Sequence, residues 1–330
     1  MRAWRVHEFG HPRDVMRLDQ VEPPEAGPGQ VVIAVEAAGL NFADNLIIAG
    51  RYQERPPLPY TPGLEAAGLV VAAGTGAGHL LGRRVVAGPM VSQGGGLAEL
   101  MVCDADRVFG IPDSLGSAAA AAIHMNYQTG WIALHRRTQI EAGDVLLVHA
   151  GAGGVGSAAI QLGLAAGARV IATAGGSGKV AVCRRLGAHV VIDYTTEDFV
   201  AMVKDDTAGR GADVVYDPVG GDVFDRSTKC IAFEGRILVV GFTSGRIPSL
   251  PVNHALVKNY SVVGVHAGLY RTALPEMWPH VHQELMVLHE QGLIDPLVHS
   301  EVRLEDTRDG LVRIADRGTW GKVVVRPSMP

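Results

Sequence analysis

Residues 145–163 read VLLVHAGAGGVGSAAIQLG, and this stretch decides the fold. An apolar run leads into a glycine-rich turn, and a helical run of small and apolar residues follows. The glycines match the spacing G-x-G-x-x-G in the strand–turn–helix context that makes this pattern informative. In such a turn the first glycine permits the tight bend, the second lets backbone amides approach a pyrophosphate, and the third permits close helix packing. The stretch therefore predicts a dinucleotide-binding turn made of Gly151, Ala152, Gly153, Gly154, Val155 and Gly156.

From residue 145 to residue 266, apolar runs alternate with helical segments. The predicted strands are 145–149, 169–173, 190–194, 212–217, 236–241 and 261–266, and the predicted helices are 155–166, 179–186, 197–204 and 223–232. Near-continuous apolar strands separated by helices indicate a parallel sheet covered on both faces. We therefore expect an α/β protein with a doubly wound, Rossmann-type parallel sheet.

The flanking segments have a different pattern. Short β-type runs at 30–38, 68–73, 84–87 and 99–102 are cut by Pro and Gly, which predicts a β-rich, partly open barrel. After residue 266, a long helix near 275–291 precedes β-type runs at 298–304 and 322–326, which resemble the first segment. At 330 residues the chain is too long for one core. The expected domains are 1–120 with 267–330, and 121–266 between them.

Composition excludes several classes of protein. The formal charge of −5 and the scattered Lys and Arg provide no basic field for nucleic acid or anionic membranes. No apolar stretch reaches the roughly 18 residues of a membrane span, and the start, MRAWRVHEFG, lacks a signal peptide's apolar region. We expect a cytoplasmic protein. The three cysteines are far apart and form no CxxC pair, which argues against a disulfide framework or structural zinc.

The segment after the second strand predicts the cofactor. An NAD site places an acid there to accept the ribose hydroxyls, but residues 173–179 read TAGGSGK and contain no carboxylate. Ser177 and Lys179 instead offer a hydroxyl and a cation to a 2′-phosphate, and Tyr194 could add a phenolic donor. These residues favour NADPH over NADH.

Further motifs extend over nearly the whole chain. They are AAGLNFADNLIIAGRY at 37–52, LPYTPGLEAAGLVV at 58–71, GGLAEL at 95–100, VVYDPVGG at 214–221, LVVGFTSG at 238–245 and GKVVVRP at 321–327. In this order and spacing the chain resembles the medium-chain dehydrogenase/reductase superfamily, and within it the zinc-free quinone oxidoreductase (zeta-crystallin-like) group. The resemblance implies a GroES-like catalytic domain beside a Rossmann domain, with NADPH in the cleft. It also implies a homodimer formed by edge pairing of the sixth strand, 261–266, whose apolar edge would need covering.

The resemblance also provides a test for zinc. Zinc-dependent members carry an early Cys, a later Gly-His-Glu motif and a four-Cys lobe. The corresponding stretches here read GLNF at 39–42 and GLE at 63–65, and the lobe is missing. Catalytic zinc needs three protein ligands, so we expect no metal. Without one, the site would reduce an already activated acceptor, such as a quinone or an α,β-unsaturated carbonyl.

The resemblance implies three residues for the acceptor site and several for the cofactor. Asn41 would bond the carboxamide or the acceptor oxygen, Tyr52 would donate to the developing oxyanion, and Asp44 would orient neighbours or serve as an ordinary capping acid. The implied cofactor contacts are Thr129 beside the nicotinamide, Gly241, Phe242 and Thr243 at the NMN half, and Arg317 at the 2′-phosphate. His124 departs from the family pattern, and we interpret it as a packed residue rather than an acid.

Three functions remain open at this stage. An NADPH-dependent reductase of quinones or activated alkenes is the leading hypothesis. An enoyl thioester (acyl-CoA) reductase would need a basic groove, and no clustered Lys or Arg suggests one. A catalytically idle NADPH-binding protein would retain the glycines without the chemistry.

Overall fold

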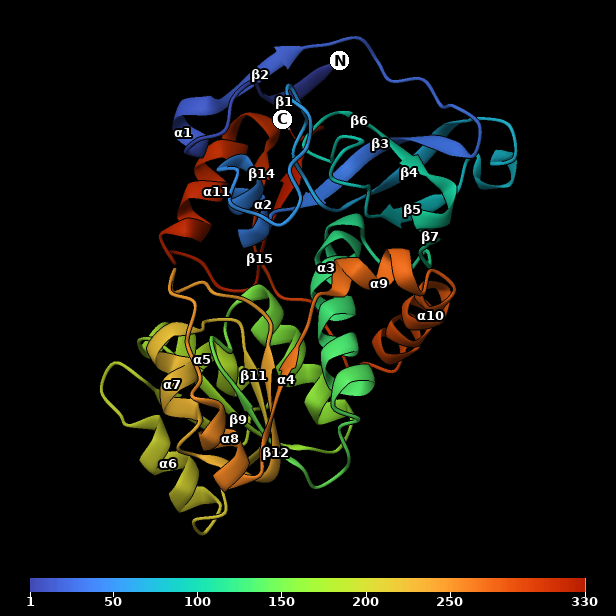
Figure 1. The fold of residues 1–330 in the computed structure, drawn as a ribbon. Helices are drawn as coiled ribbons and strands as arrows, with labels where there is room; N and C mark the ends of the chain where they lie inside the picture. The colour runs from blue at the N-terminus through green and yellow to red at the C-terminus, as the bar shows by residue number, and fades with distance from the viewer. Residues whose placement is uncertain (330) are drawn as a thin grey trace. The chain divides into compact units, whose positions relative to one another are not determined.

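The computed structural model describes residues 1–329 and divides into two compact units, each described by itself here (Figure 1). Unit 1 comprises Met1–Met125 and the segment from Pro296 onward, and unit 2 comprises Asn126–Asp295. Unit 2 thus ends later than the expected 121–266. The reason lies in two helices, α9 (Ala267–Ala273) and α10 (Met277–Glu290), which bond to the end of α3 (Ser117–Trp131). Arg271 donates to Gln128 at 2.7 Å, and the Trp131 indole donates to Glu284 at 2.5 Å.

Unit 2 contains a six-stranded parallel sheet in the order β10-β9-β8-β11-β12-β13. Its strands are β8 (Val145–Val148), β9 (Arg169–Ala174), β10 (Val190–Asp193), β11 (Ala212–Asp217), β12 (Ile231–Val239) and β13 (Ser261–Gly264). Its remaining helices are α4 (Gly154–Ala165), α5 (Ser177–Arg185), α6 (Phe199–Asp206), α7 (Gly221–Ser227) and α8 (Val252–Lys258). The order reverses beside β8, as in a doubly wound Rossmann sheet. The predicted fold class is confirmed.

One predicted helix in unit 2 was wrong in extent. The expected helix 223–232 ends at Ser227, and β12 begins at Ile231 instead of residue 236. Tertiary pairing explains the difference, because Ala212 of β11 lies opposite Ile231 and its amide donates to Cys230 O at 2.9 Å. Pairing with the neighbouring strand β11 overrides the helix that was predicted for the end of this stretch.

Unit 1 is β-rich and includes the end of the chain. Its seven-stranded mixed sheet has the path β14-β15-β3-β4-β5-β7, with β6 also paired to β3, and β1 and β2 form a separate ribbon. The strands are β1 (Arg2–Val6), β2 (Met16–Gln20), β3 (Gln30–Gly39), β4 (Ala66–Ala73), β5 (Arg84–Ala87), β6 (Leu100–Asp104), β7 (Val108–Gly110), β14 (Val298–Arg303) and β15 (Lys322–Arg326). β15 pairs antiparallel with β3, so the tail completes the first segment's sheet, as expected.

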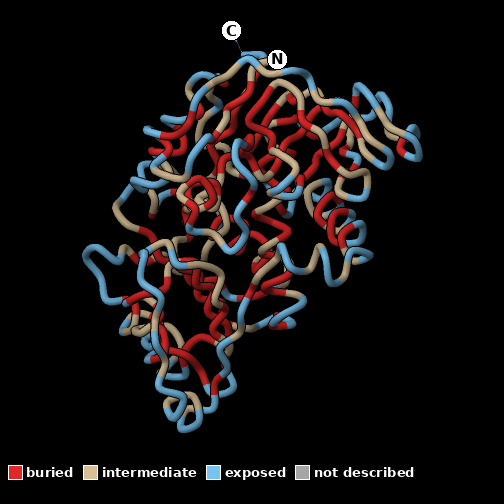
Figure 2. The backbone as a smooth tube through the Cα atoms, turned by 45° about the horizontal axis from the view of Figure 1, so that its top comes forward, coloured by how far each residue is buried: buried red, intermediate tan, exposed pale blue. Residues whose placement is uncertain are grey.

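Short helices complete unit 1, and each unit has its own core. The helices are α1 (Pro12–Val15), α2 (Phe42–Ile48) and α11 (Thr307–Ala315). Helix α2 was not predicted from the sequence; Asn41 is its N-cap, Asp44 lies in it and Tyr52 follows it. Buried backbone follows the central strands (Figure 2), and β8 is buried along its whole length. Among residues 1–329, no helix combines the length and apolarity that a bilayer crossing needs.

Candidate active site

The glycine-rich turn joins β8 to α4. The Gly151 amide donates to Thr173 O at 2.9 Å, which ties the turn to β9. A Cβ on Gly156 would lie 2.2 Å from Ala150 O, and one on Gly151 would lie 3.1 Å from Cys183 Sγ. Only glycine fits at either position without a shift of the backbone or the core. Gly153 is the N-cap of α4, so the first amides of this helix have no helical partners and can meet an anion.

A buried histidine supports the turn from behind, and the sequence analysis missed it. His149 bonds Thr173 Oγ1 through Nδ1 at 3.0 Å and Ser227 Oγ through Nε2 at 2.8 Å. Because the Ser227 hydroxyl donates to Val223 O, it accepts from the ring, and the hydrogen therefore lies on Nε2. Burial, together with the charge of Arg226, lowers the pKa of His149 to about 3. This neutral ring links β8, β9 and α7 directly beside the turn.

Three of the four residues predicted for the 2′-phosphate follow β9 and β10 of unit 2, namely Ser177, Lys179 and Tyr194. Ser177 is the first residue of α5 and is exposed, and Lys179 is half-buried two positions later. Tyr194 follows β10, and its hydroxyl lies 2.6 Å from where a Cβ on Gly175 would stand. The phenol therefore covers the Gly175 backbone. The fold brings Tyr194 to the loop that leads into α5, the helix that carries Ser177 and Lys179.

An acid that the sequence analysis did not consider shapes the same loop. Asp193 Oδ1 accepts the Gly176 amide at 3.0 Å and the Thr195 hydroxyl at 2.6 Å. The Thr195 hydroxyl, with the Gly176 and Thr195 amides, lowers the pKa of Asp193. Gly176 has φ 82° and ψ 153°, a conformation almost confined to glycine. Asp193 thus holds the backbone that leads into Ser177.

Two further loops meet at the carboxyl ends of β11 and β12. Asp217 Oδ1 accepts the Val219 and Gly220 amides at 2.8 and 2.9 Å. The Thr243 amide donates to Pro218 O at 3.1 Å, and Phe242 lies against Gly220. Gly241 and Thr243 are half-buried, while Phe242 is exposed. The predicted NMN segment therefore lies at the carboxyl ends of β11 and β12, on the same edge of the sheet as the turn after β8, where such folds bind ligands.

The remaining predicted cofactor residues have mixed surroundings. Thr129 is half-buried on α3, and Asn126 of the same helix packs on the turn, with its Nδ2 2.5 Å from a Cβ on Gly154. His124 is buried, and its ring centroid lies 5.8 Å from that of Phe109. Arg317 belongs to unit 1, where it is exposed on the turn after α11.

Unit 1 contains a buried ion pair next to the predicted acceptor residues. Lys322 Nζ donates to Glu65 Oε1 at 2.6 Å and to Asn41 Oδ1 at 2.7 Å, and Glu65 and Lys322 are fully and almost fully buried. Asn41 donates to Glu65 and to Gly39 O, so both amide hydrogens have partners within the unit. The Met125 amide donates to Glu65 Oε2 at 2.7 Å. Sequence reasoning named Asn41 but missed its two partners, which lie on β15 and just before β4.

Asp44 and Tyr52 lie around this cluster. Asp44 is buried on α2, and its Oδ2 accepts the Asn41 amide at 2.8 Å, which caps the helix. Burial raises the pKa of Asp44 to about 7, although the Asn41 amide and Lys322 oppose the rise. Tyr52 is half-buried, and burial with the nearby charges of Glu54 and Asp44 raises the pKa of its phenol. Tyr52 therefore keeps its hydroxyl hydrogen at neutral pH and can donate it.

The donor set in residues 1–329 includes no group of three or more His, Cys, Asp or Glu side chains placed to hold a metal ion. Cys103, Cys183 and Cys230 are buried free thiols. The stretches 39–42 and 63–65, compared above with the zinc-ligand motifs, read GLNF and GLE and contain no Cys or His.

Comparisons with known proteins agree with this architecture. Residues 27–113 match the family model of the alcohol dehydrogenase GroES-like domain, and residues 154–284 match that of the zinc-binding dehydrogenase. The quinone oxidoreductase-like protein 2 homolog of Nematostella vectensis is 38% identical over 327 residues, covering 98% of this chain and 88% of that one.

Two solved structures are similar along the whole chain. The Escherichia coli quinone oxidoreductase complexed with NADPH has a TM-score of 0.91 and 30% identity, covering 99% of this chain and 100% of that one. A mycobacterial protein complexed with NADPH has a TM-score of 0.92 and 31% identity, with the same coverage.

Proposed function

The chain belongs to the quinone oxidoreductase group of the medium-chain dehydrogenase/reductase superfamily, and on that premise we propose that it binds NADPH and reduces quinones or other α,β-unsaturated carbonyls without zinc. The observation that carries this proposal is the glycine turn at 151–156, with the N-terminus of α4 beyond it and a basic residue, Lys179, in the first turn of α5. Two similar solved structures are complexes with NADPH, which supports the choice of cofactor.

The residues present fit the cofactor. Gly151 and Gly156 let the turn pack closely, because a Cβ on Gly151 would meet core side chains and one on Gly156 would meet the Ala150 carbonyl. The amides at the start of α4, which begins after Gly153, suit a pyrophosphate. Gly153, Gly154 and Val155 would hold the pyrophosphate with them. Ser177, Lys179, Tyr194 and Arg317 would receive the 2′-phosphate, and Thr129, Gly241, Phe242 and Thr243 would border the NMN half. When bound, the reduced nicotinamide supplies a hydride.

The protein's own share of the reaction is positioning and charge stabilisation. Hydride addition to a quinone or enone leaves an oxyanion, and a neutral phenol donates to it well. Tyr52 is the proposed donor, because a phenol carries its hydrogen at neutral pH and burial raises the pKa of this one further. Asn41 is the proposed contact for the carboxamide or the acceptor oxygen. A hydrogen bond donated by Asn41 would replace the one to Glu65 or to Gly39 O, whereas Asn41 Oδ1 can accept a second donor beside Lys322.

The proposal of a zinc-free reaction rests on the residues that replace the metal ligands. The stretches 39–42 and 63–65 contain no Cys or His, and Lys322 Nζ lies 2.7 Å from Asn41 Oδ1. A buried ammonium at this point repels a divalent cation. An acceptor that is already activated needs no Lewis acid.

A homodimer through β13 is the proposed assembly, in a cytoplasmic protein. β13 is the edge of the parallel sheet and is largely exposed, with Val262 41% exposed. α8, which precedes β13, also exposes Val252 and Leu256 at 83% and 75%. An exposed edge with apolar side chains favours pairing with a second copy.

Steady-state oxidation of NADPH and NADH against a panel of quinones, enones and an enoyl-CoA tests the function. We expect turnover with quinones or enones and a clear preference for NADPH. Turnover confined to the enoyl-CoA would replace the proposal with thioester reduction. Tight NADPH binding without turnover of any acceptor would identify an idle binding protein.

A further inference from the structure

A buried histidine of unit 2 has no part in the proposed chemistry and yet makes two side-chain hydrogen bonds. His149 follows β8 directly, and its ring bonds Thr173 Oγ1 at 3.0 Å and Ser227 Oγ at 2.8 Å. The Ser227 hydroxyl donates to Val223 O at 2.7 Å, so it accepts from Nε2. The neutral ring carries no second hydrogen, so Nδ1 accepts from the Thr173 hydroxyl. The ring is therefore the middle of a hydrogen-bond chain that runs from Thr173 to Val223.

This chain joins the three segments that surround the predicted cofactor site. His149 leads into the glycine turn. Thr173 lies near the end of β9 and leads into residues 174–179, the segment predicted for the 2′-phosphate. Ser227 lies on α7, which begins directly after the loop 217–220, and the predicted NMN segment packs against that loop. One side chain thus links the segments predicted for the pyrophosphate, the 2′-phosphate and the NMN half.

The residue between this histidine and the glycine turn has a strained backbone. Ala150 has φ 50°, in the left-handed region that residues other than glycine rarely adopt. Its carbonyl accepts the Gly153 amide at 2.8 Å, so its conformation sets where the turn meets α4. Thr173 holds both neighbours, because its carbonyl accepts the Gly151 amide at 2.9 Å and its hydroxyl bonds the His149 ring. Such strain persists only where the surrounding structure over-determines it.

We infer that His149 is a positioning residue for NADPH, which holds the three cofactor segments in their binding arrangement without touching the cofactor. The residue is 1% exposed, so a ligand on the surface of the turn does not reach it. Loss of its hydrogen bonds frees Ala150 to relax toward an ordinary backbone conformation. The amides at the start of α4 then turn away from the pyrophosphate. This role rests on the proposed function, because it requires NADPH as the ligand.

A purely packing role for this ring makes a different prediction. The ring of His149 meets that of Phe199 edge to face, with their centroids 4.9 Å apart, and an apolar side chain of similar volume would pack there as well. His149→Leu keeps much of the volume and loses both hydrogen bonds, whereas His149→Gln keeps a donor and an acceptor. This pair of variants separates hydrogen bonding from packing.

Fluorescence titration of NADPH and NADH, with steady-state kinetics against a quinone, tests the role. His149→Leu should raise the Kd of NADPH about tenfold to a hundredfold, as the loss of two hydrogen bonds predicts. The Kd of NADH should rise by the same factor, because both nucleotides contain the pyrophosphate. The KM for NADPH should rise with kcat nearly unchanged, which is the signature of lost uniform binding.

Two rescue experiments follow from the geometry of the chain. His149→Gln should recover much of the NADPH affinity, because its amide can accept from Thr173 and donate to Ser227. Imidazole added to His149→Ala should also restore affinity, since the free ring can fill the cavity and form both hydrogen bonds again. A side chain that served packing alone would gain nothing from Gln over Leu.

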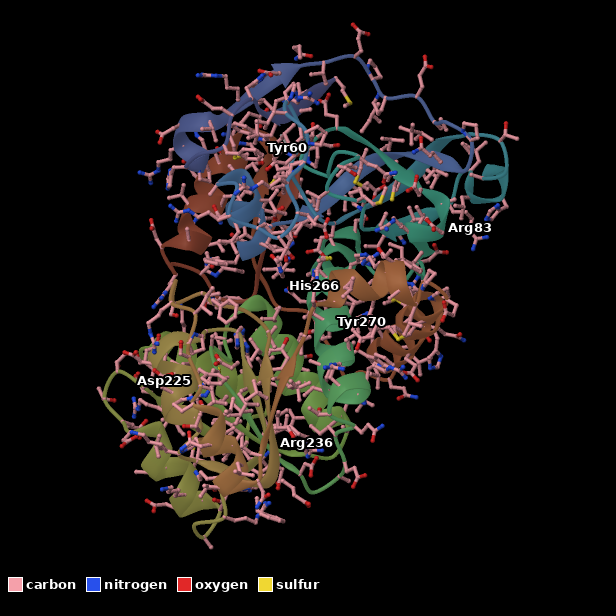
Figure 3. The ribbon with its side chains drawn as sticks, viewed as in Figure 1. Tyr60, Arg83, Asp225, Arg236, His266 and Tyr270 are labelled. Atoms are coloured by element: carbon pink, nitrogen blue, oxygen red, sulfur yellow. The ribbon has the colours of Figure 1, made fainter. Side chains whose placement is uncertain are left out.

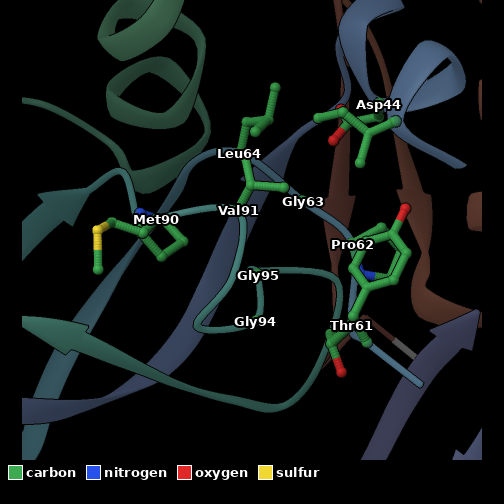
Figure 4. A pocket seen from close by; sticks show the side chains of 12 residues that line it. Asp44, Thr61, Pro62, Gly63, Leu64, Met90, Val91, Gly94 and Gly95 are labelled. Atoms are coloured by element: carbon green, nitrogen blue, oxygen red, sulfur yellow. The ribbon is translucent and has the colours of Figure 1, made fainter. Parts of the chain in front are cut away.

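Two control variants lose buried polar groups away from the chain. Arg236, marked in Figure 3, donates to Thr138 O at 2.8 Å and to Asp144 at 3.3 Å, and Asp144 precedes β8 at the opposite end of the sheet. Arg236→Met should lower the melting temperature and leave NADPH affinity unchanged. In unit 1, Tyr60 lines the small pocket of Figure 4 together with Asp44, and its buried hydroxyl has no hydrogen-bond partner among residues 1–329. Tyr60→Phe should also leave NADPH affinity unchanged.

The outcomes separate the positioning role from the proposed function. If His149→Leu does not fold, Thr173→Val and Ser227→Ala each remove one end of the chain, and both should raise the Kd of NADPH. Wild-type affinity in these variants, or in a His149→Leu protein that a thermal melt shows to be folded, would overturn the role. An equal rise in Kd for Arg236→Met at a matched loss of stability would overturn it too, because affinity would then follow stability alone.

A wild type that binds neither nucleotide would overturn the proposed function and this role with it. The expected changes in affinity without turnover of any acceptor would support the role and overturn the proposed reaction instead.

Discussion

Lys179 has the residue-scale role on which the choice of cofactor most depends. It is half-buried in the first turn of α5, where a cation is disfavoured by the helix dipole. A bound 2′-phosphate would offset this unfavourable interaction between the Lys179 cation and the helix dipole. Lys179→Glu should weaken NADPH binding roughly tenfold to a hundredfold, the worth of one hydrogen bond to a charged group, and should leave NADH binding nearly unchanged. Fluorescence titration of both nucleotides measures this, and equal weakening would remove the 2′-phosphate assignment.

Asp44 provides a residue-scale prediction about stability and pH. Its pKa rises from 3.8 in the unfolded chain to about 7 in the fold. The folded state therefore binds the proton more tightly, and its stability falls as pH rises from about 4 to about 7. Asn cannot titrate, so the melting temperature of Asp44→Asn relative to the wild type should rise across this window and level off above it. A constant difference from pH 4 to pH 8 would show that Asp44 has an ordinary pKa.

At the scale of elements, the Lys322–Glu65 pair joins β15 to the residue that precedes β4. Removing Lys322 leaves a fully buried carboxylate with only the Asn41 and Met125 donors. Lys322→Met should lower the free energy of unfolding by about 3–5 kcal/mol, and adding Glu65→Gln should restore most of that loss. The matched control on β15 is Arg326→Met, because Arg326 pairs with Glu301 at the surface. This substitution should lower the free energy of unfolding by less than about 1 kcal/mol. Urea unfolding measures all three, and similar losses for both single variants would contradict this account.

The glycine turn provides the second prediction at this scale. A Cβ on Gly156 would stand 2.2 Å from Ala150 O, so the turn between β8 and α4 would have to open. Gly156→Ala should cost about 1–3 kcal/mol of stability, as overpacking does, and should abolish measurable NADPH binding. Gly116→Ala is the control, because nothing lies within 4 Å of the added atom. NADPH affinity close to wild type in Gly156→Ala would mean that the turn does not form the pyrophosphate site.

At the scale of the whole molecule, the edge strand β13 decides the expected assembly. Val262 is 41% exposed on this edge, where a second copy would cover it. Val262→Lys should convert a dimer to a monomer in sedimentation or light scattering, because it would bury a charge in the interface. Val71→Lys changes a valine of similar exposure, 45%, on β4 of unit 1 and should remain dimeric. A monomeric wild type, or a dimeric Val262→Lys, would rule out this interface.

The sequence by itself determined the fold class and predicted the cofactor turn, because both follow from local rules. Alternation of apolar strands and helices specifies a parallel sheet, and three glycines at fixed spacing need no distant partner to be informative. The family motifs extended this to Asn41, Asp44 and Tyr52 as site residues, without showing what surrounds them.

Only the tertiary structure decided the environment of those residues, since it depends on contacts between distant segments. Lys322 reaches Asn41 from the far end of the chain, Asp193 of β10 reaches Gly176 beyond the neighbouring β9, and Tyr60 shares a pocket with Asp44. Strand pairing at Ile231 likewise shortened a helix that local propensity had extended. At the turn itself, the sequence determined the glycines, whereas the fold supplied His149 and Asn126 behind them. Charge state and burial are properties of the packed molecule, so no local pattern could have given the pKa of Asp44.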